Sequence, residues 1–309
     1  MPPGGNSSTP GGERQKWRGA RRRSATARSW TRPRELDSAR AHAPGGALAR
    51  NEAETRTQLI DPDLHARGWT EDLIRREQTE RTVEIVDGKP RRQTHFRTDY
   101  TLRIKVAPDA QPVAVAVLEA KSEDKPATYG LDQAKTYQRT AKRLNVPFVI
   151  ATNGHQWTLH DNRTATTTPL PRPMAEFSTP DDLREAYEDA IGINLTAPAA
   201  GPVITPYKGG ETARRYYQDA AIRAVLEKLA RGETRALLSL ATGSGKTFIA
   251  VNLLRRIADA GQLRRALFLC DREELRNQGL TAFQRAFGAD AAAVSGSNAQ
   301  KNARVLIAT

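Results

Sequence analysis

The stretch Ala241–Thr247, with the sequence ATGSGKT, constrains the fold more strongly than any other part of the chain. Glycines in such a loop let backbone N–H groups face the phosphates of a nucleotide at the start of a helix. The loop therefore requires a strand before it, expected at 236–240, and a helix after it, expected at 246–260. Alternating strands and helices predict a parallel sheet with helical crossovers. The other elements expected in this sheet domain, at 211–309, are helices at 211–230 and 273–287 and strands at 266–270 and 305–308.

The residues of this loop have separate expected roles in binding ATP and Mg²⁺. The two glycines give the backbone its freedom, Lys246 would reach the terminal phosphates, and the hydroxyl of Thr247 would bind Mg²⁺. Leu240 stands where the strict form of the pattern has glycine. The expected nucleotide-binding residues of the loop are Thr242, Gly243, Ser244, Gly245, Lys246 and Thr247.

A second pattern lies earlier in the chain, in the run Val117–Lys121 with the sequence VLEAK. Residues i and i+2 of a strand point to the same face, so Glu119 and Lys121 project together. Asp99 is expected on a neighbouring strand, and two carboxylates can hold one Mg²⁺ ion, which polarises a phosphate and supplies hydroxide near neutral pH. Lys121 could position the attacking water or neutralise charge that develops on the phosphate. The pattern is typical of a metal-dependent nuclease.

This second pattern is short, and a solvated strand end is the alternative interpretation. The apolar run before Glu119 favours the nuclease, because it places the acid at the exit of a buried strand. A helix expected at 128–144 follows and brings Gln133 and Tyr137 to one face, one turn apart. Glu54 could add a carboxylate, but an acid in the first turn of an expected helix is better explained by the helix dipole.

Residues 51–165 are expected to form a domain with a mixed α/β sheet. A helix capped by Asn51 ends near Gly68, and a hairpin turns at Asp87 and Gly88. Further strands are expected at 100–106, 113–118, 148–151 and 157–160. The Thr- and Pro-rich stretch 166–210, with a short helix at 181–191, is expected to be a linker.

The first fifty residues differ from the rest in composition and charge. They contain eleven of the 48 Lys and Arg residues but three of the 35 Asp and Glu residues, so they carry +8 of the net charge of +13. Their few large apolar side chains cannot bury enough surface to offset the entropy lost on ordering. We therefore expect a disordered basic tail at 1–50, either a nonspecific DNA-binding arm or residues translated upstream of the true start.

The single cysteine, Cys270, excludes an intrachain disulfide and favours a reducing compartment. No apolar run approaches the ~18 residues of a membrane span, so a soluble, cytoplasmic protein with no membrane partner is expected. His95, His155 and His160 form no ligand pattern with a cysteine, which argues against a zinc site.

Asp99, the triplet Glu119-Ala-Lys121 and the helical pair Gln133 and Tyr137 resemble the PD-(D/E)xK nuclease core of the restriction (R) subunit of type I restriction-modification enzymes. The resemblance implies a restriction-endonuclease-like fold and a catalytic site in which Asp99 and Glu119 bind Mg²⁺. It also implies that Gln133 and Tyr137 support this site and its DNA.

Two further segments, 51–56 and 151–154, resemble the N-terminal domain of the same family. Thr98 precedes Asp99 where the name of the fold has proline, a position that is loose across these nucleases. The assignment of the nuclease core therefore stands without the proline.

The phosphate loop, with leucine at 240, resembles that of superfamily 2 helicases and translocases, whose motor consists of RecA-like lobes. Tyr216-Tyr217-Gln218 resembles the Q motif, in which an aromatic side chain stacks on adenine and Gln218 reads its edge. The segment 268–275 resembles the motif with which such motors grip a DNA backbone, with Arg272 as the expected DNA contact. Ordinary helix packing by the Tyr-Tyr-Gln triplet, and a salt bridge from Arg272 to Glu273 or Glu274, are the alternatives.

The resemblance implies an R subunit that cuts double-stranded DNA and translocates it with ATP, in a complex with methylation and specificity subunits. No Asp-Glu box and no second lobe follow Val305–Thr309, so we expect an N-terminal fragment with a truncated first lobe that binds ATP weakly and does not hydrolyse it. The alternatives are another nuclease-helicase fusion, such as a type III restriction subunit or a stand-alone helicase, and a catalytically silent DNA-binding fragment. In type III enzymes the nuclease usually follows the motor, whereas here it comes first.

Overall fold

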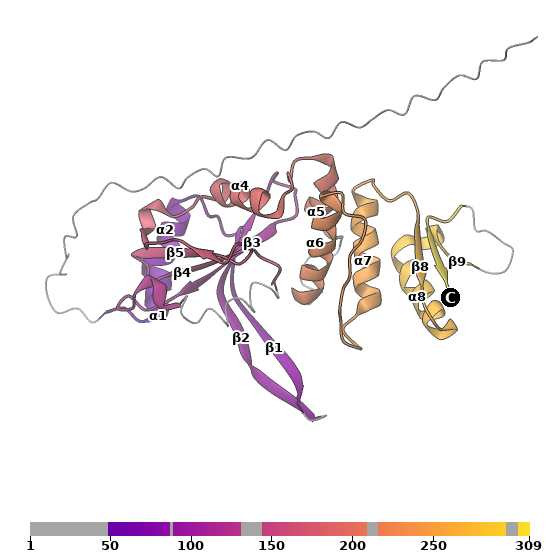
Figure 1. The fold of residues 1–309 in the computed structure, drawn as a ribbon, viewed down its shortest axis with the longest axis horizontal. Helices are drawn as coiled ribbons and strands as arrows, with labels where there is room; N and C mark the ends of the chain where they lie inside the picture. The colour runs from indigo at the N-terminus through magenta and orange to yellow at the C-terminus, as the bar shows by residue number, and fades with distance from the viewer. Residues whose placement is uncertain (1–48, 87–88, 131–143, 209–215, 295–301) are drawn as a thin grey trace, which may run out of the picture. The chain divides into compact units, whose positions relative to one another are not determined.

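The computed structural model describes residues 49–86, 89–130, 144–208, 216–294 and 302–309 (Figure 1). These residues belong to one compact unit, Leu48–Thr309. The basic tail expected at 1–50 lies almost wholly outside the described residues. Among the described residues, no helix is both long and apolar enough to cross a membrane.

A mixed sheet forms the first half of the described chain, as the sequence predicted. Its strands follow the order β1-β2-β3-β4-β5-β6, and β7 pairs with β5. The β3 and β4 strands run parallel, and the other neighbours are antiparallel. The strands are β1 (Ile74–Val86), β2 (Lys89–Ile104), β3 (Val113–Ala120), β4 (Phe148–Thr152), β5 (Gln156–Asp161), β6 (Thr166–Thr167) and β7 (Arg172–Pro173).

The first hairpin is longer than the sequence suggested. Two separate strands, one ending the hairpin and one at 100–106, were expected, but β2 is continuous from Lys89 to Ile104. The reason is the pairing with β1, which runs from Val86 opposite Lys89 to Ile74 opposite Leu102 with one irregularity. Continuous pairing places Asp99 inside this long strand, in agreement with its expected position on a strand next to that of Glu119.

One face of the sheet is covered by helical segments from both ends of this domain. At the start lie α1 (Glu52–Thr55), the π-helical turn η1 (Arg56–Ile60) and α2 (Asp61–Ala66). The backbone N–H of Glu54 donates to Asn51 Oδ1 at 2.9 Å, and Asn51 N–H donates to Glu54 Oε2 at 3.0 Å. This reciprocal capping box supports the interpretation of Glu54 as a helix-start acid.

The stretch expected to be a linker, 166–210, packs on the same sheet. It forms η3 (Met174–Glu176), α4 (Pro180–Ile191), η4 (Pro198–Ala200) and α5 (Gly201–Ile204). Leu183 and Tyr187 of α4 share a buried cluster with Leu118 of β3, and Trp69 Nε1 donates to the Ser178 carbonyl at 2.8 Å. The segment therefore contributes to the core that holds β2 and β3 in place.

The second half contains a three-stranded parallel sheet with strand order β8-β10-β9, which confirms the predicted parallel arrangement. Its elements are α6 (Tyr216–Ala230), α7 (Lys246–Asp259), β8 (Ala266–Leu269), α8 (Glu273–Phe287), η5 (Gly288–Asp290), β9 (Ala291–Ala293) and β10 (Val305–Ala308). The sequence predicted α7, α8, β8 and β10 closely, but β9 was missed because three alanines carry little strand signal.

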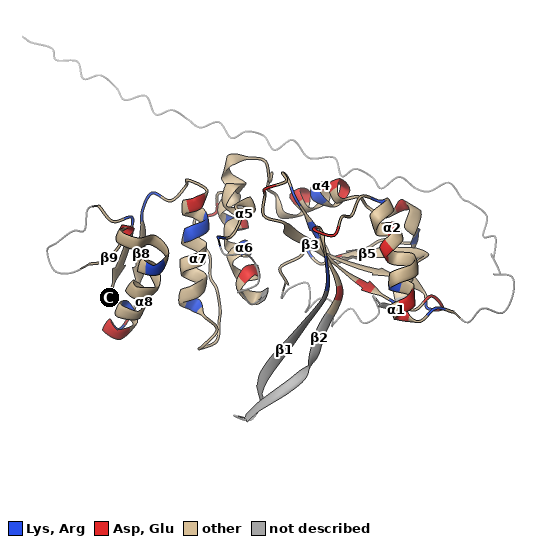
Figure 2. Ribbon diagram, turned by 180° about the vertical axis from the view of Figure 1, so that it is seen from behind, with Lys and Arg blue, Asp and Glu red and all other residues tan. Residues whose placement is uncertain are grey.

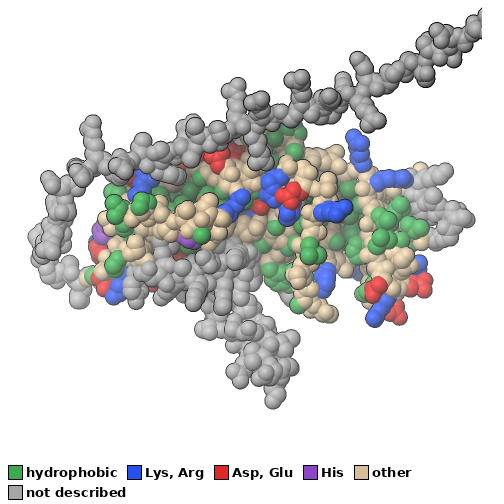
Figure 3. Space-filling model, viewed as in Figure 1, with side chains coloured by type: hydrophobic (Ala, Val, Ile, Leu, Met, Phe, Trp, Pro, Cys, Tyr) green, Lys and Arg blue, Asp and Glu red, His purple; other side chains and the backbone are tan. Residues whose placement is uncertain are grey.

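The prediction of a strand at 236–240 was wrong. These residues have no regular structure and belong to neither sheet, and Leu237 is 92% exposed. A strand needs a hydrogen-bonded neighbour, and the edge of β8 remains unpaired with 236–240 among the described residues. Leu267 and Leu269 of β8 are exposed, and Figure 3 shows hydrophobic side chains (green) on the surface of this part of the molecule.

Most of the helix expected at 128–144 lies outside the described residues, which leave out 131–143. A 3-10 turn, η2 (Ala127–Gly130), precedes residues 131–143. Gln133 and Tyr137 are among them, so their proposed support of the nuclease site stays a prediction.

Candidate functional site

Asp99 and Glu119 lie opposite each other on adjacent strands. The antiparallel register pairs Tyr100 of β2 with Leu118 of β3, which sets Asp99 against Glu119 one step further along. Directly opposite residues have Cβ atoms about 4.5–5.5 Å apart and point to the same face of the sheet. Both acids are largely buried, with exposures of 6% and 8%. The two carboxylates that the sequence proposed as metal ligands therefore lie side by side.

The carboxylate of Asp99 is held from two directions. Its Oδ1 accepts from an Arg56 Nη at 3.2 Å, and its Oδ2 accepts from the Ala120 backbone N–H at 2.9 Å. The second bond links Asp99 to the residue between Glu119 and Lys121. Sequence reasoning gave Arg56 no role at this site, because it lies 43 positions earlier, although its segment 51–56 resembled the family's N-terminal domain. Its proximity results from packing of the η1 turn on the sheet.

The pKa of Glu119 is raised to about 9, chiefly by burial and in the same direction by the nearby Asp99. The positive charge of Lys121 opposes this shift, so the lysine lies near the acid pair. Two adjacent buried carboxylates disfavour double ionisation, and a divalent cation between them would reverse that preference. Mg²⁺ is commonly held by one or two carboxylates together with waters, so the donor set fits this ion. Within the described part of the chain, no cluster of three or more His, Cys, Asp or Glu side chains adds a larger metal site.

The end of β3 is fixed beside this acid pair. The Lys121 backbone N–H donates to the Thr152 carbonyl at 2.8 Å, which extends the pairing of β3 with β4. Two residues later, Glu123 accepts from the Arg50 backbone N–H at 3.0 Å, and its Oε1 lies 2.8 Å from His155 Nε2. These partners hold the pKa of Glu123 low, at about 2.

A further carboxylate approaches the site from the first helix. The negative charge of Glu52 contributes to the raised pKa of Glu119, so Glu52, and not Glu54, is the acid of α1 that is electrostatically coupled to the pair. Figure 2 shows acidic residues (red) at α1. The sequence signal was present, since Glu52 follows the Asn51 cap directly, but the capping pattern gave no reason to prefer it.

The phosphate loop takes the expected turn before α7. Gly243 and Gly245 have φ values of +79° and +86°, and Gly245 caps the helix that begins at Lys246. Lys246 Nζ donates to the Ala241 carbonyl at 2.9 Å, so the lysine closes the loop on itself. Thr247 lies half-buried in the first turn of α7, and Thr242 is exposed. The loop therefore has its sequence-predicted shape although the strand before it is missing.

The Tyr-Tyr-Gln triplet contacts the loop from α6. Tyr217 Oη and Gln218 Nε2 both donate to the Ser244 carbonyl, each at 3.1 Å. A Cβ added to Gly245 would lie 2.6 Å from Gln218 Nε2, so a side chain at 245 would collide with this amide. Gln218 thus bonds to the loop and does more than pack within its own helix.

Arg272 lies just before α8 and is 73% exposed. Its Nε is 3.9 Å from Asp271, while Glu273 pairs with Arg276 at 2.7 Å. The alternative of a salt bridge from Arg272 to Glu273 or Glu274 is therefore not what forms here. Cys270, at the end of β8, is half-buried and lies 3.3 Å from the Ala308 carbonyl.

The sequence matches two family models, one in each part of the chain. The model described as "Type I restriction enzyme R protein N terminus (HSDR_N)" matches residues 75–168, which include the acid pair and Lys121. The model described as "Type III restriction enzyme, res subunit" matches residues 211–309, which include the phosphate loop.

Individual relatives agree with these matches. The type I restriction enzyme EcoAI endonuclease subunit of Escherichia coli is 33% identical over 257 residues, 79% of this chain and 30% of that subunit. The EcoKI endonuclease subunit of E. coli K12 is 29% identical over 46% of this chain and 12% of its own length. A solved fragment structure, described as an HsdR subunit of a type I restriction enzyme from Vibrio vulnificus YJ016, is 29% identical with a TM-score of 0.65. That match covers 85% of this chain and 47% of the solved chain, so the protein spans less than half the length of each relative.

The match of the mixed-sheet part to one restriction-enzyme model, and of the parallel-sheet part to another, defines the class: a chain with two domains typical of restriction-enzyme subunits. Within that class, the chain corresponds to the N-terminal region of the R subunit of type I restriction enzymes.

Proposed function

We propose that this chain carries the Mg²⁺-dependent endonuclease of a type I restriction enzyme and the ATP-binding lobe that begins its DNA translocase. The single observation that carries the nuclease is the pair Asp99 and Glu119, two buried carboxylates opposite each other beside Lys121. A surface acid pair would be solvated, whereas burial without a cation is costly. The pair therefore calls for a bound cation.

Each residue of the pair has a distinct part in this proposal. Mg²⁺ bound by the two carboxylates would polarise the scissile phosphate and lower the pKa of a bound water. Asp99 is held in one orientation because Arg56 and the Ala120 N–H both donate to it. Glu119 supplies the second oxygen ligand, and Lys121 neutralises charge that develops on the phosphate. The two strands hold these groups more rigidly than a loop would.

In the motor lobe we propose that the phosphate loop binds the phosphates of ATP with Mg²⁺ on Thr247. Lys246 would exchange the Ala241 carbonyl for the terminal phosphates, a stronger charge-assisted partner. Gln218 would contact adenine while it stays next to Ser244. Arg272, exposed before α8, would contact the DNA backbone.

The remaining parts of the proposal follow from the family. Double-stranded DNA is the substrate, the methylation and specificity subunits are the partners, and the cytoplasm is the location. A type III-like subunit or a stand-alone nuclease-helicase is a weaker alternative, because the nuclease comes first in the chain. The alternative of a different kind is a DNA-binding fragment without catalytic activity.

A plasmid assay distinguishes DNA cleavage from DNA binding without cleavage. Supercoiled plasmid is incubated with the 309-residue chain in Mg²⁺ and in EDTA, and DNA binding is measured in parallel. We expect nicked or linear product in Mg²⁺ alone, and none with Lys121→Ala. Lys125→Ala, an exposed lysine four residues further on, is the matched control and should cut normally. Equal inertness of all three proteins with unchanged binding would favour the silent DNA-binding fragment.

A further inference from the structure

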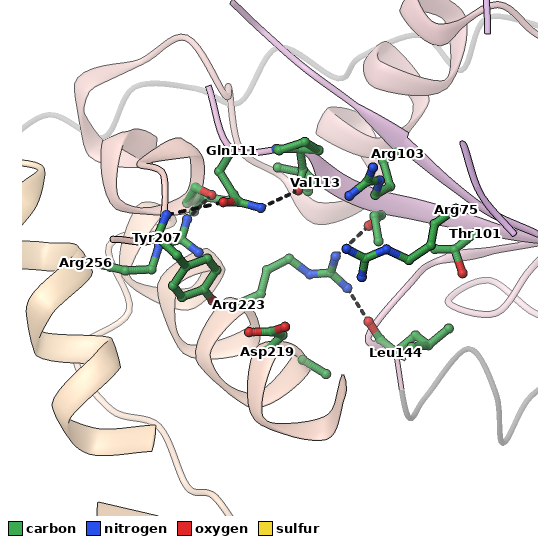
Figure 4. A pocket seen from close by; sticks show the side chains of 14 residues that line it. Arg75, Thr101, Arg103, Gln111, Val113, Leu144, Tyr207, Asp219, Arg223 and Arg256 are labelled. Carbon is green, nitrogen blue, oxygen red and sulfur yellow. Dashed lines mark hydrogen bonds between the residues drawn. The ribbon is translucent and has the colours of Figure 1, made fainter. Parts of the chain in front are cut away.

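A basic hollow lies between the mixed sheet and helix α6, outside both sites described so far. Its volume is about 90 Å³, and residues of β1, β2 and β3 line it on one side and those of α6 on the other (Figure 4). Its charged lining residues are four arginines and one acid, namely Arg75, Arg103, Arg223, Arg256 and Asp219. The lining therefore has a formal charge of +3.

Two of these arginines form the fixed wall of the hollow. Arg223 of α6 donates to the Ala114 carbonyl at 2.8 Å and to the Asn145 carbonyl at 2.6 Å. Arg256 of α7 is 4% exposed, donates to the Val203 carbonyl at 2.5 Å and stacks 4.2 Å from the centre of the Tyr207 ring. These bonds hold both guanidinium groups at the hollow.

The other two arginines come from the sheet. Arg75 of β1 is paired in register with Thr101 of β2, and Arg103 lies two residues beyond Thr101. Figure 4 shows the side chains of Arg75 and Arg223 pointing toward one another from opposite walls. Arg103 also donates to the Asp72 carbonyl at 2.5 Å.

The sheet arginines share a face with the nuclease acids. Leu102 and Ile104 are buried in the core on the other face, so Asp99, Thr101 and Arg103 alternate with core residues. At ~3.3 Å per residue, Arg103 lies about 13 Å along the strand from Asp99. The acid pair and the basic hollow therefore lie on the same face of β2.

Like charges cannot be relieved here by loss of a proton, because the guanidinium group stays protonated in proteins. Glu227 balances the charge of Arg223, and the other three guanidinium groups near Asp219 repel each other more strongly in a partly enclosed space than in water. An anion in the hollow would offset that repulsion. Bidentate donors of this kind match the oxygens of a phosphate.

We propose that this hollow binds a backbone phosphate of the DNA strand that occupies the nuclease site. The ~13 Å spacing along β2 would place this phosphate a short distance from the scissile one on the same strand. The nuclease would then hold its substrate at two points of a single strand. This inference rests on the proposed nuclease function, since that function sets which strand passes Asp99.

The test measures DNA binding without cleavage. A fluorescent duplex is titrated with the full chain in EDTA at several salt concentrations, for the wild type and the double variant Arg75→Gln/Arg103→Gln. Each lost phosphate contact lowers the salt dependence of log K by about one, so for one phosphate we expect weaker binding and a slope smaller by about one. Arg163→Gln, an exposed arginine in the turn between β5 and β6, is the control and should match the wild type. The single variant Arg75→Gln should weaken binding in the same direction by less and guards against a fold defect in the double variant.

A second experiment measures the unfolding temperature with inorganic phosphate and with ATP. If the hollow holds a free phosphate or a nucleotide, these anions should raise the unfolding temperature of the wild type and not of the double variant, while the DNA slope stays unchanged. If the double variant and the wild type have the same salt dependence of DNA binding, the proposal is overturned, whatever the effect of phosphate or ATP. If the wild type fails to cut plasmid but the two salt dependences differ as expected, the nuclease function is refuted and the phosphate site stands.

Discussion

Arg223 and Glu227, one turn apart on α6, form an ion pair of 3.3 Å that is buried between the motor helix and the nuclease domain. Glu227 is 3% exposed and accepts from Tyr187 Oη at 2.5 Å and from Asn145 Nδ2 at 3.0 Å. Helix α6 also carries Gln218, which bonds to the phosphate loop. The same helix therefore contacts the nucleotide site and the nuclease domain.

Glu227→Ala is expected to destabilise the protein strongly. The change leaves a buried arginine, a tyrosine hydroxyl and an amide without their acceptor, and breaking a buried ion pair costs about 3–5 kcal/mol. Urea unfolding should show that loss, whereas Glu185→Ala, an exposed acid on α4, should change the free energy of unfolding by less than about 0.5 kcal/mol. Similar values for the two variants would mean that the network is not important for stability.

Glu119→Gln is expected to stabilise the metal-free protein at alkaline pH. The pKa of Glu119 is raised from 4.5 to about 9, so above pH 4.5 the unfolded chain is ionised where the folded chain retains a proton. The stability of the wild type should therefore fall as pH rises from about 4.5 to about 9, and glutamine removes this slope. Thermal unfolding between pH 5 and 9 in EDTA measures it. An identical slope in both proteins would contradict the burial of an acid pair.

The same variant is expected to lose its response to Mg²⁺. A ligand that binds the folded state alone raises the unfolding temperature, and the wild type should show this rise at millimolar Mg²⁺. Glu54→Gln, which changes an acid of the capping box, should keep the Mg²⁺ response. Loss of the response in Glu54→Gln but not in Glu119→Gln would move the metal site to α1.

Glu123→Gln is expected to flatten the acid side of the stability profile. The Arg50 N–H and His155 lower the pKa of Glu123 to about 2, so its contribution is complete above the unfolded pKa of 4.5 and is lost as pH falls toward 2. Urea unfolding at pH 2.5, 3.5 and 5 should show a smaller pH dependence for the variant. Asp109→Asn, an exposed acid in the β2–β3 loop, is the control. An unchanged profile for Glu123→Gln would show that the contacts of Glu123 with Arg50 and His155 do not stabilise the fold.

Gly245→Ala is expected to weaken ATP binding more than Gly243→Ala. Both glycines have positive φ, but an added Cβ meets the Gln218 amide only at 245 and open space at 243. A fluorescent ATP analogue gives the two affinities, and the larger loss is expected at 245, where the Gln218 amide would have to move aside. Gly261→Ala, which shares the positive φ far from the loop, should bind normally. Equal losses at 243 and 245 would show that backbone strain alone matters.

The features that could be predicted from the sequence are those that depend on local residue spacing. Glu119 and Lys121 came from the two-residue period of a strand, and the phosphate loop came from glycine spacing before a helix. Arg56 and Arg223 could not be predicted, because they act 43 and 109 positions away from Asp99 and Ala114 through packing of helices on the sheet. The strand at 236–240 failed for the converse reason: its residues are apolar, but strand formation depends on a partner that local sequence does not specify.

The Mg²⁺ dependence of plasmid cleavage is the most direct test of a nuclease site in which Asp99 and Glu119 bind one Mg²⁺ ion. The initial rate is measured from zero to 20 mM Mg²⁺ for the wild type, Glu119→Gln and the control Glu185→Gln at equal DNA occupancy. We predict a saturating rise for the wild type and the control, and a loss of at least about 100-fold for Glu119→Gln, because loss of a residue that only orients a metal ligand already costs about 10- to 100-fold. Cleavage by Glu119→Gln at the wild-type rate, or no cleavage by the wild type at any Mg²⁺ concentration, would contradict a Mg²⁺-dependent nuclease site at Asp99 and Glu119.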